Sequence, residues 1–168
     1  MYLGILIFLL NSFLGFLTIY KRRTLESIVF GIFASSFGLW ALSIYATLAT
    51  SSLLWGRTAF FGAILGIGSL FLFSFIFPGN KKIPFPKLLL ILAPPVFFCI
   101  ATCTNLMLRD VAIVANSIIG TYGPVMTGYQ IFAPIYIFGS IYIIYKKYRK
   151  STYQDKNKIG YVFLGVTL

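Results

Sequence analysis

The sequence predicts an all-α, polytopic bundle of transmembrane helices with a small β-hairpin outside the membrane. Five apolar runs each reach the roughly 20 residues that a helix needs to cross the hydrocarbon core. Only 10% of the 168 residues are charged, whereas a soluble domain carries about a quarter. The basic residues lie in short clusters between these runs and form no continuous face. The net charge of +11 therefore does not indicate nucleic-acid binding.

The five expected spans cover, in chain order, residues 2–20, 27–49, 53–77, 88–106 and 125–145, each to within a few residues. The first has no charged side chain and precedes its positive charges, which favours a retained helix over a signal peptide. The third ends at Pro78 and Gly79. Residues 159–168 begin another apolar run that is too short to cross. We therefore expect residues 1–168 to form a single membrane-embedded region at the front of a longer protein.

The distribution of lysine and arginine predicts the orientation. Three loops that must share one side of an alternating bundle hold these residues: Lys21, Arg22, Arg23, Lys81, Lys82, Lys87, Lys146, Lys147, Arg149, Lys150, Lys156 and Lys158. The opposite side has only Arg57 and Arg109. The basic side is expected to be cytoplasmic, which places the amino terminus outside a plasma (inner) membrane.

A hairpin is expected over about residues 110–124, between the fourth and fifth spans. Two β-branched runs flank Asn116-Ser117, and Gly123-Pro124 closes the second run. An isolated hairpin is marginal in water, so this one would have to rest on the helix ends.

The residue inventory argues against an enzyme or a metal site. The chain has no histidine and only three carboxylates, Glu26, Asp110 and Asp155, all outside the spans. Acid–base catalysis needs two convergent titratable groups, and a buried pathway for protons needs an intramembrane one. Cys99 and Cys103 are interpreted as small packing residues. We expect no cofactor.

Small residues in the third span predict close helix packing. Gly62 and Gly66 form a GxxxG pair, which lets two backbones approach closely within a membrane. The pair would serve packing within the bundle or, alternatively, a homodimer contact. Pro94 and Pro95 kink or begin the fourth span.

Arg57 lies about one turn into the third span, and its side chain has two possible roles. It anchors the helix at the interface by reaching outward, or it points into the bundle. On the second hypothesis Arg57, Trp55 and Tyr45 form the polar corner of an external ligand pocket, which Tyr122, Tyr129 and Gln130 close from the hairpin side. The remaining aromatic residues, Trp40 included, are expected to face lipid or to pack.

The chain resembles the amino-terminal seven-helix (7TM) sensor region of bacterial histidine kinases. The resemblance is carried, in order, by Asn11 and Gly15, Lys21-Arg22-Arg23, the segment Gly38-Leu39-Trp40-Ala41-Leu42-Ser43-Ile44-Tyr45-Ala46, the segment Leu54-Trp55-Gly56-Arg57-Thr58-Ala59-Phe60-Phe61-Gly62, Phe77-Pro78, Pro94-Pro95, Tyr122-Gly123-Pro124 and Tyr145-Lys146-Lys147-Tyr148-Arg149. It covers nearly the whole chain, but the sixth and seventh helices and the cytoplasmic effector are missing.

The resemblance implies a sensory input module that passes an external or membrane-borne stimulus to a cytoplasmic output domain of the full-length chain. The lipid bilayer is its other expected partner. The main alternative is a small multi-pass transporter or a substrate-binding membrane subunit, and a third is a structural membrane protein without a ligand.

Overall fold

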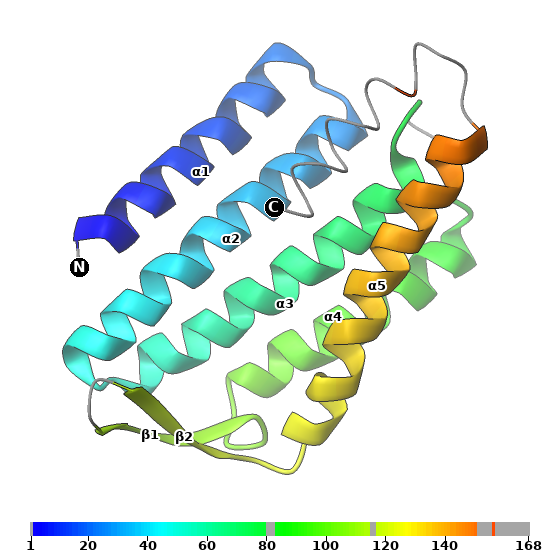
Figure 1. Ribbon diagram of the computed structural model, residues 1–168. Helices are drawn as coiled ribbons and strands as arrows, with labels where there is room; N and C mark the ends of the chain where they lie inside the picture. The colour runs from blue at the N-terminus through cyan, green and yellow to red at the C-terminus, as the bar shows by residue number, and fades with distance from the viewer. Residues whose placement is uncertain (1, 80–82, 115–116, 151–155, 157–168) are drawn as a thin grey trace.

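The computed structural model describes residues 2–79, 83–114, 117–150 and 156. Five helices and two strands follow in chain order, as Figure 1 shows: α1 (Tyr2–Lys21), α2 (Leu25–Thr50), α3 (Leu53–Ile76), α4 (Phe85–Thr102), β1 (Leu108–Val114), β2 (Ser117–Tyr122) and α5 (Met126–Lys150). All five helices are long and apolar enough to cross a membrane. The predicted fold class is therefore confirmed. The start of a sixth span, residues 159–168, lies outside the described residues.

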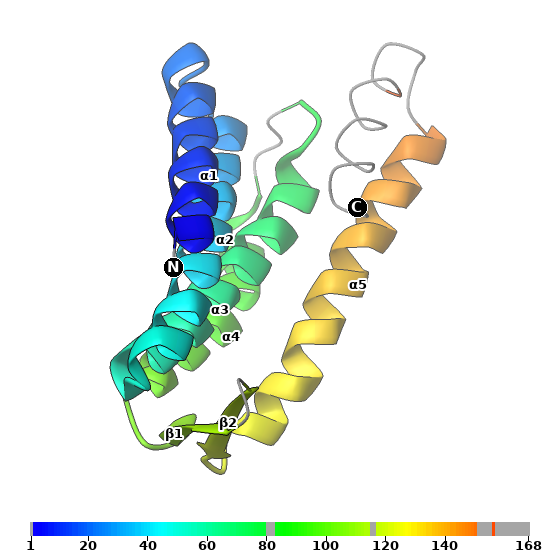
Figure 2. The same cartoon turned by 60° about the vertical axis from the view of Figure 1, so that its left-hand side comes forward.

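The helices form successive layers with α3 at the centre. α1 contacts α2, α2 contacts α3, and α4 and α5 both contact α3, which also touches β1. In Figure 2, α1 and α2 lie on one side of α3 and α5 lies on the other. The most buried helix is accordingly α3, and α1 is mostly exposed.

Local signals set the helix ends. Thr24 caps α2 by accepting a hydrogen bond from the amide of Ser27, as N-cap threonines do. α2 ends at Ser51, whose left-handed φ of 52° allows a two-residue turn into α3. α3 ends before Pro78, which cannot continue a helix.

The fourth helix differs from the predicted span of 88–106 at both ends. It begins earlier, at Phe85, because Pro86 is accommodated in the first turn, where its missing N–H costs nothing. It ends earlier, at Thr102, because the chain turns over residues 103–107. Pro94 and Pro95 lie inside the helix and neither begins it.

The predicted external β element is an antiparallel hairpin in which Val111 is paired with Gly120 and Ile113 with Ile118. It lies across the same end of the bundle as the amino terminus (Figure 1). Two main-chain hydrogen bonds of 3.0 Å, from Gly123 to Met107 and from Val125 to Leu106, join its two ends. Met107 is fully buried and fixes the turn to the bundle.

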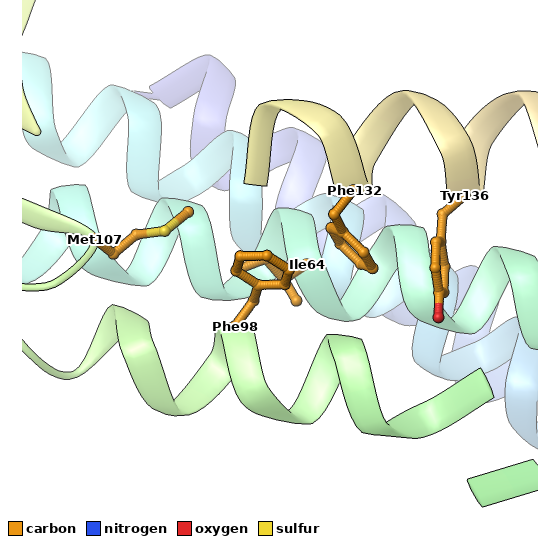
Figure 3. Close-up of a cluster of buried hydrophobic side chains, with 5 residues drawn as sticks. All are labelled: Ile64, Phe98, Met107, Phe132 and Tyr136. Atoms are coloured by element: carbon orange, nitrogen blue, oxygen red, sulfur yellow. The ribbon is translucent and has the colours of Figure 1, made fainter. Parts of the chain in front are cut away.

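The central core joins α3, α4 and α5 through large side chains. Figure 3 shows Ile64, Phe98, Met107, Phe132 and Tyr136 converging from these helices and from the turn before β1. Phe132 lies with its ring centre 4.8 Å from that of Phe98 and 4.3 Å from that of Tyr136. Aromatic contacts therefore hold α4 and α5 together across the face of α3.

Candidate ligand-binding site

A cavity of about 220 Å³ lies beneath the hairpin, where α2, α3 and the start of α5 converge. Each of these elements contributes to the wall: Trp40, Ile44 and Thr47 from α2, Gly56, Ala59, Phe60 and Ala63 from α3, Leu108, Val111, Ile118, Gly120 and Tyr122 from the hairpin, and Tyr129 from α5. None of these described lining residues is charged.

The α2 wall is one face of a helix. Trp40, Ile44 and Thr47 follow the i, i+4, i+7 spacing that places side chains on one stripe. Thr47 donates its hydroxyl to the carbonyl of Ser43 at 2.7 Å, so its oxygen is left as an acceptor. Trp40 is 37% exposed, and its ring centre lies 5.2 Å from that of Phe37.

The α3 wall depends on small residues at the point where the hairpin meets the helix. A Cβ atom at Gly56 would lie 2.9 Å from side-chain carbons of both Leu108 and Val111. Real Cβ atoms essentially never approach this closely, so a larger residue would force the side chains of Leu108 and Val111 to shift, whereas glycine lets β1 lie on the helix as it does. The hairpin thereby becomes the roof of the cavity.

The aromatic rings meet edge to face. Phe60 packs at 89° to Tyr122 and at 86° to Tyr129, with ring centres 6.3 and 5.6 Å apart. This is the arrangement that aromatic quadrupoles prefer. Both tyrosines carry a hydroxyl that has no hydrogen-bond partner among the described residues.

The structure brings together two of the six residues that the sequence suggested for an external pocket. Tyr122 and Tyr129 line the cavity, whereas Trp55, Tyr45 and Gln130 are not among its lining residues. Tyr45 packs instead against α1, since a Cβ at Gly4 would fall 2.6 Å from its Cδ2 atom. Trp55 is half-buried and Gln130 exposed.

Arg57 points toward the turn after α4, away from the cavity. Its guanidinium donates to the carbonyls of Cys103 and Leu108, at 3.4 and 3.1 Å, and to Oδ1 of Asn105 at 2.5 Å. A cation is favoured there by the negative end of the α4 dipole. Arg57 therefore fixes the turn that leads into the hairpin roof.

Sequence reasoning missed every lining residue except Tyr122 and Tyr129, including the whole α2 wall. Trp40 was expected to face lipid or to pack, and Ile44 and Thr47 were not singled out.

A second polar contact lies at the opposite end of the bundle. Lys147 of α5 donates hydrogen bonds to the carbonyls of Phe75, at 2.8 Å, and of Phe77. These carbonyls end α3, where the helix dipole again favours a cation. Lys87 lies 4.6 Å from the ring centre of Phe75. The ends of α3, α4 and α5 opposite the hairpin are thus joined by two lysines.

The glycine pair in α3 is used within the chain. A Cβ at Gly62 would lie 2.9 Å from the main-chain nitrogen of Trp40 and 3.0 Å from the carbonyl oxygen of Ser36. The packing is looser at Gly66, where an added Cβ would lie 3.8 Å from the Cβ of Ser36 in α2. This supports packing of α2 on α3, and because α2 already covers Gly62 the pair offers no surface to a second copy.

A comparison with protein families gives one match. The model described as the N-terminal 7TM region of histidine kinase matches residues 3–168, and the resemblance seen in the sequence is thereby confirmed. No curated protein and no solved structure matches the chain.

Proposed function

We propose, since the chain belongs to the family of N-terminal 7TM regions of histidine kinases, that it is the sensory input module of a two-component signalling protein. On this proposal it perceives an external or membrane-borne stimulus and relays it to a cytoplasmic output domain that follows in the full-length chain. The observation that carries the proposal is the family match over nearly all of the sequence.

The orientation belongs to the same proposal. Among the described residues, Lys21, Arg22, Arg23, Lys87 and the basic residues of α5 lie at the end of the bundle opposite the hairpin (Figure 1). Lysine and arginine concentrate on the cytoplasmic side of membrane proteins. The amino terminus, the hairpin and the cavity then face outward, and the end of α5 faces the cytoplasm.

A stimulus acts by shifting a population. It must bind one helix arrangement better than another, because equal affinity for both changes nothing. The cavity provides a place for such binding at the outer end of α3. The contact of Lys147 with Phe75 and Phe77 supplies a point at the inner end where a changed position of α3 alters α5.

The alternative of a transporter gains no specific support. Transport folds are expected to hold substrate at discontinuous helices near the middle of the membrane. Here α4 is continuous from Phe85 to Thr102, across both Pro94 and Pro95.

The test uses the full-length protein in lipid vesicles supplied with ATP. Formation of phosphohistidine is measured for the wild type, for Lys147→Met and for the matched control Lys146→Met, whose side chain is exposed. If α3 and α5 relay a signal, Lys147→Met changes the rate of phosphorylation roughly fivefold or more, as a coupling of 1–3 kcal/mol requires. Lys146→Met leaves the rate unchanged.

A full-length protein that forms no phosphohistidine would overturn the sensory proposal. A rate that responds equally to both lysine substitutions would remove the α3–α5 contact from the relay.

A further inference from the structure

We propose that the cavity beneath the hairpin binds a small uncharged molecule with a single ring and one hydrogen-bonding group. This inference rests on the proposed sensory function and adds the chemical class of the stimulus. It draws on the cavity's volume, depth, ring geometry and polar atoms.

The volume limits the size of the ligand. A cavity of about 150 Å³ is known to hold benzene, and drug-sized ligands occupy about 300 Å³ or more. The present cavity has about 220 Å³. This volume matches one ring with a short substituent.

The lining, and the depth of the inner part of the cavity, disfavour a charged ligand. Trp40 lies about ten residues before the end of α2, and Ala63 about ten after the start of α3. At 1.5 Å per residue these two deepest positions are about 15 Å from the hairpin end, near the middle of a bilayer, whereas Thr47 and Gly56 lie only about one turn from that end. A charge at that depth is costly unless it is paired. The nearest candidate partner on α3, Arg57, is bound to the turn after α4.

The walls favour a ring. Trp40, Phe60, Tyr122 and Tyr129 present aromatic surface from four different elements. Such side chains gain about 0.5–1.5 kcal/mol per ring pair beyond the area that they bury. The small side chains of Ala59 and Ala63 also line the cavity.

The polar atoms of the wall are few and well defined. The Thr47 oxygen accepts, since its proton is used by Ser43. The hydroxyls of Tyr122 and Tyr129 donate or accept and have no partner in the described part of the chain. A single hydroxyl, carbonyl or amine on the ligand is enough to satisfy one of them.

Fluorescence quenching tests the inference directly. The chain is placed in lipid nanodiscs with Trp55→Phe, which leaves Trp40, in the cavity wall, as the one tryptophan of the 168 residues. Three probes of similar size are titrated: 4-bromobenzyl alcohol, 4-bromobenzoate and 4-bromobenzylammonium. Bromine quenches tryptophan on contact, and unbrominated benzyl alcohol serves as the competitor.

The neutral probe is expected to quench Trp40 saturably, and benzyl alcohol to reverse the quenching. The two charged probes bind at least about tenfold more weakly, since about 1.4 kcal/mol already separates affinities by that factor. Ala63→Phe fills the cavity and abolishes saturation. Ala112→Phe, the same substitution on the exposed face of β1, has no effect.

A second variant, Tyr129→Phe, provides a test that does not depend on whether Ala63→Phe folds. Tyr129→Phe keeps the shape of the wall and removes one hydroxyl, which weakens binding of the alcohol about fivefold if that hydroxyl is used. Quenching that is linear in probe and equal in all variants reflects partition into lipid and would overturn the inference. Tighter binding of the cationic or anionic probe would overturn it as well.

This outcome is independent of the kinase assay. Saturable binding in a protein whose full-length form makes no phosphohistidine would leave the cavity's chemistry standing and remove the sensory role. Absence of binding in a protein whose phosphorylation responds to Lys147→Met would refute the ligand class proposed for the cavity and leave the sensory role standing.

Discussion

The hydroxyl of Tyr136 donates a hydrogen bond of 2.9 Å to the main-chain carbonyl of Ile91. This carbonyl lacks its usual helical donor, because the residue four positions further along α4 is Pro95, which has no N–H. Both groups are buried, and within a membrane neither can form a hydrogen bond to water instead. A tyrosine of α5 thus completes a helix that proline would otherwise leave unsatisfied.

Tyr136→Phe is expected to lower the free energy of unfolding by about 1 kcal/mol, since interhelical hydrogen bonds in membranes are worth roughly that much. Thermal unfolding in detergent measures the change, with Tyr142→Phe, whose side chain is 62% exposed, as the control. In a Pro95→Ala background the helix regains its own donor, and the cost of Tyr136→Phe shrinks. Equal costs in both backgrounds would refute this account of the bond.

Arg57→Met is expected to loosen the hairpin. The substitution keeps the length of the side chain but removes the donors to Cys103, Asn105 and Leu108. Bonds to charged groups are worth about 1.5–3 kcal/mol, and partial exposure reduces this to about 1. Hydrogen exchange of the amides in residues 108–114 should become faster. Arg109→Met, at an exposed neighbour, should not alter it, and unchanged exchange in both variants would mean that Arg57 does not hold the turn.

Gly62→Ala and Gly66→Ala form a matched pair on one helix. Alanine at residue 62 places its Cβ against the backbone of α2, which cannot yield locally, and should destabilise the bundle by about 1–3 kcal/mol. At residue 66 the nearest atom is 3.8 Å away, so alanine fits and its better helix propensity should add up to about 1 kcal/mol. Unfolding in a denaturing detergent titration compares them. A loss at residue 66 as large as at residue 62 would contradict this difference in packing.

Orientation is tested by cysteine labelling in intact cells. In a Cys99→Ala, Cys103→Ala background, Thr121→Cys exposes a thiol on β2 and Arg149→Cys exposes one near the end of α5. A membrane-impermeant maleimide should label residue 121 without lysis and residue 149 only after lysis. The opposite pattern would place the basic end outside and reverse the proposed topology.

The fold was largely predictable because lipid imposes one requirement on every span. A chain that must hide its backbone from hydrocarbon has to be helical over about 20 residues, and apolar runs of that length are visible without any tertiary information. The hairpin was visible too, as two β-branched runs around Asn116-Ser117. The end of α4 was less predictable, because Cys103 to Leu106 are as compatible with a helix as with the turn that they form.

The cavity was harder to predict for a physical reason. Helices that are apolar on every side carry no stripe to show which face turns inward, so the role of Trp40 depends on a rotation that the sequence does not reveal. Arg57 illustrates the same difficulty. Its direction depends on where the carbonyls of Cys103 and Leu108 come to lie, and these belong to a turn some 50 residues away along the chain.

The 24 residues of α3 form one uninterrupted helix about 36 Å long. Gly56, Ala59 and Ala63 near its first turns line the cavity, and the carbonyl of Phe75 near its other end accepts a hydrogen bond from Lys147. Because α3 is one continuous helix, a tilt or a slide at one end also moves the other end. On the proposed function, such a movement would reach Phe75, where the contact with Lys147 couples α3 to α5.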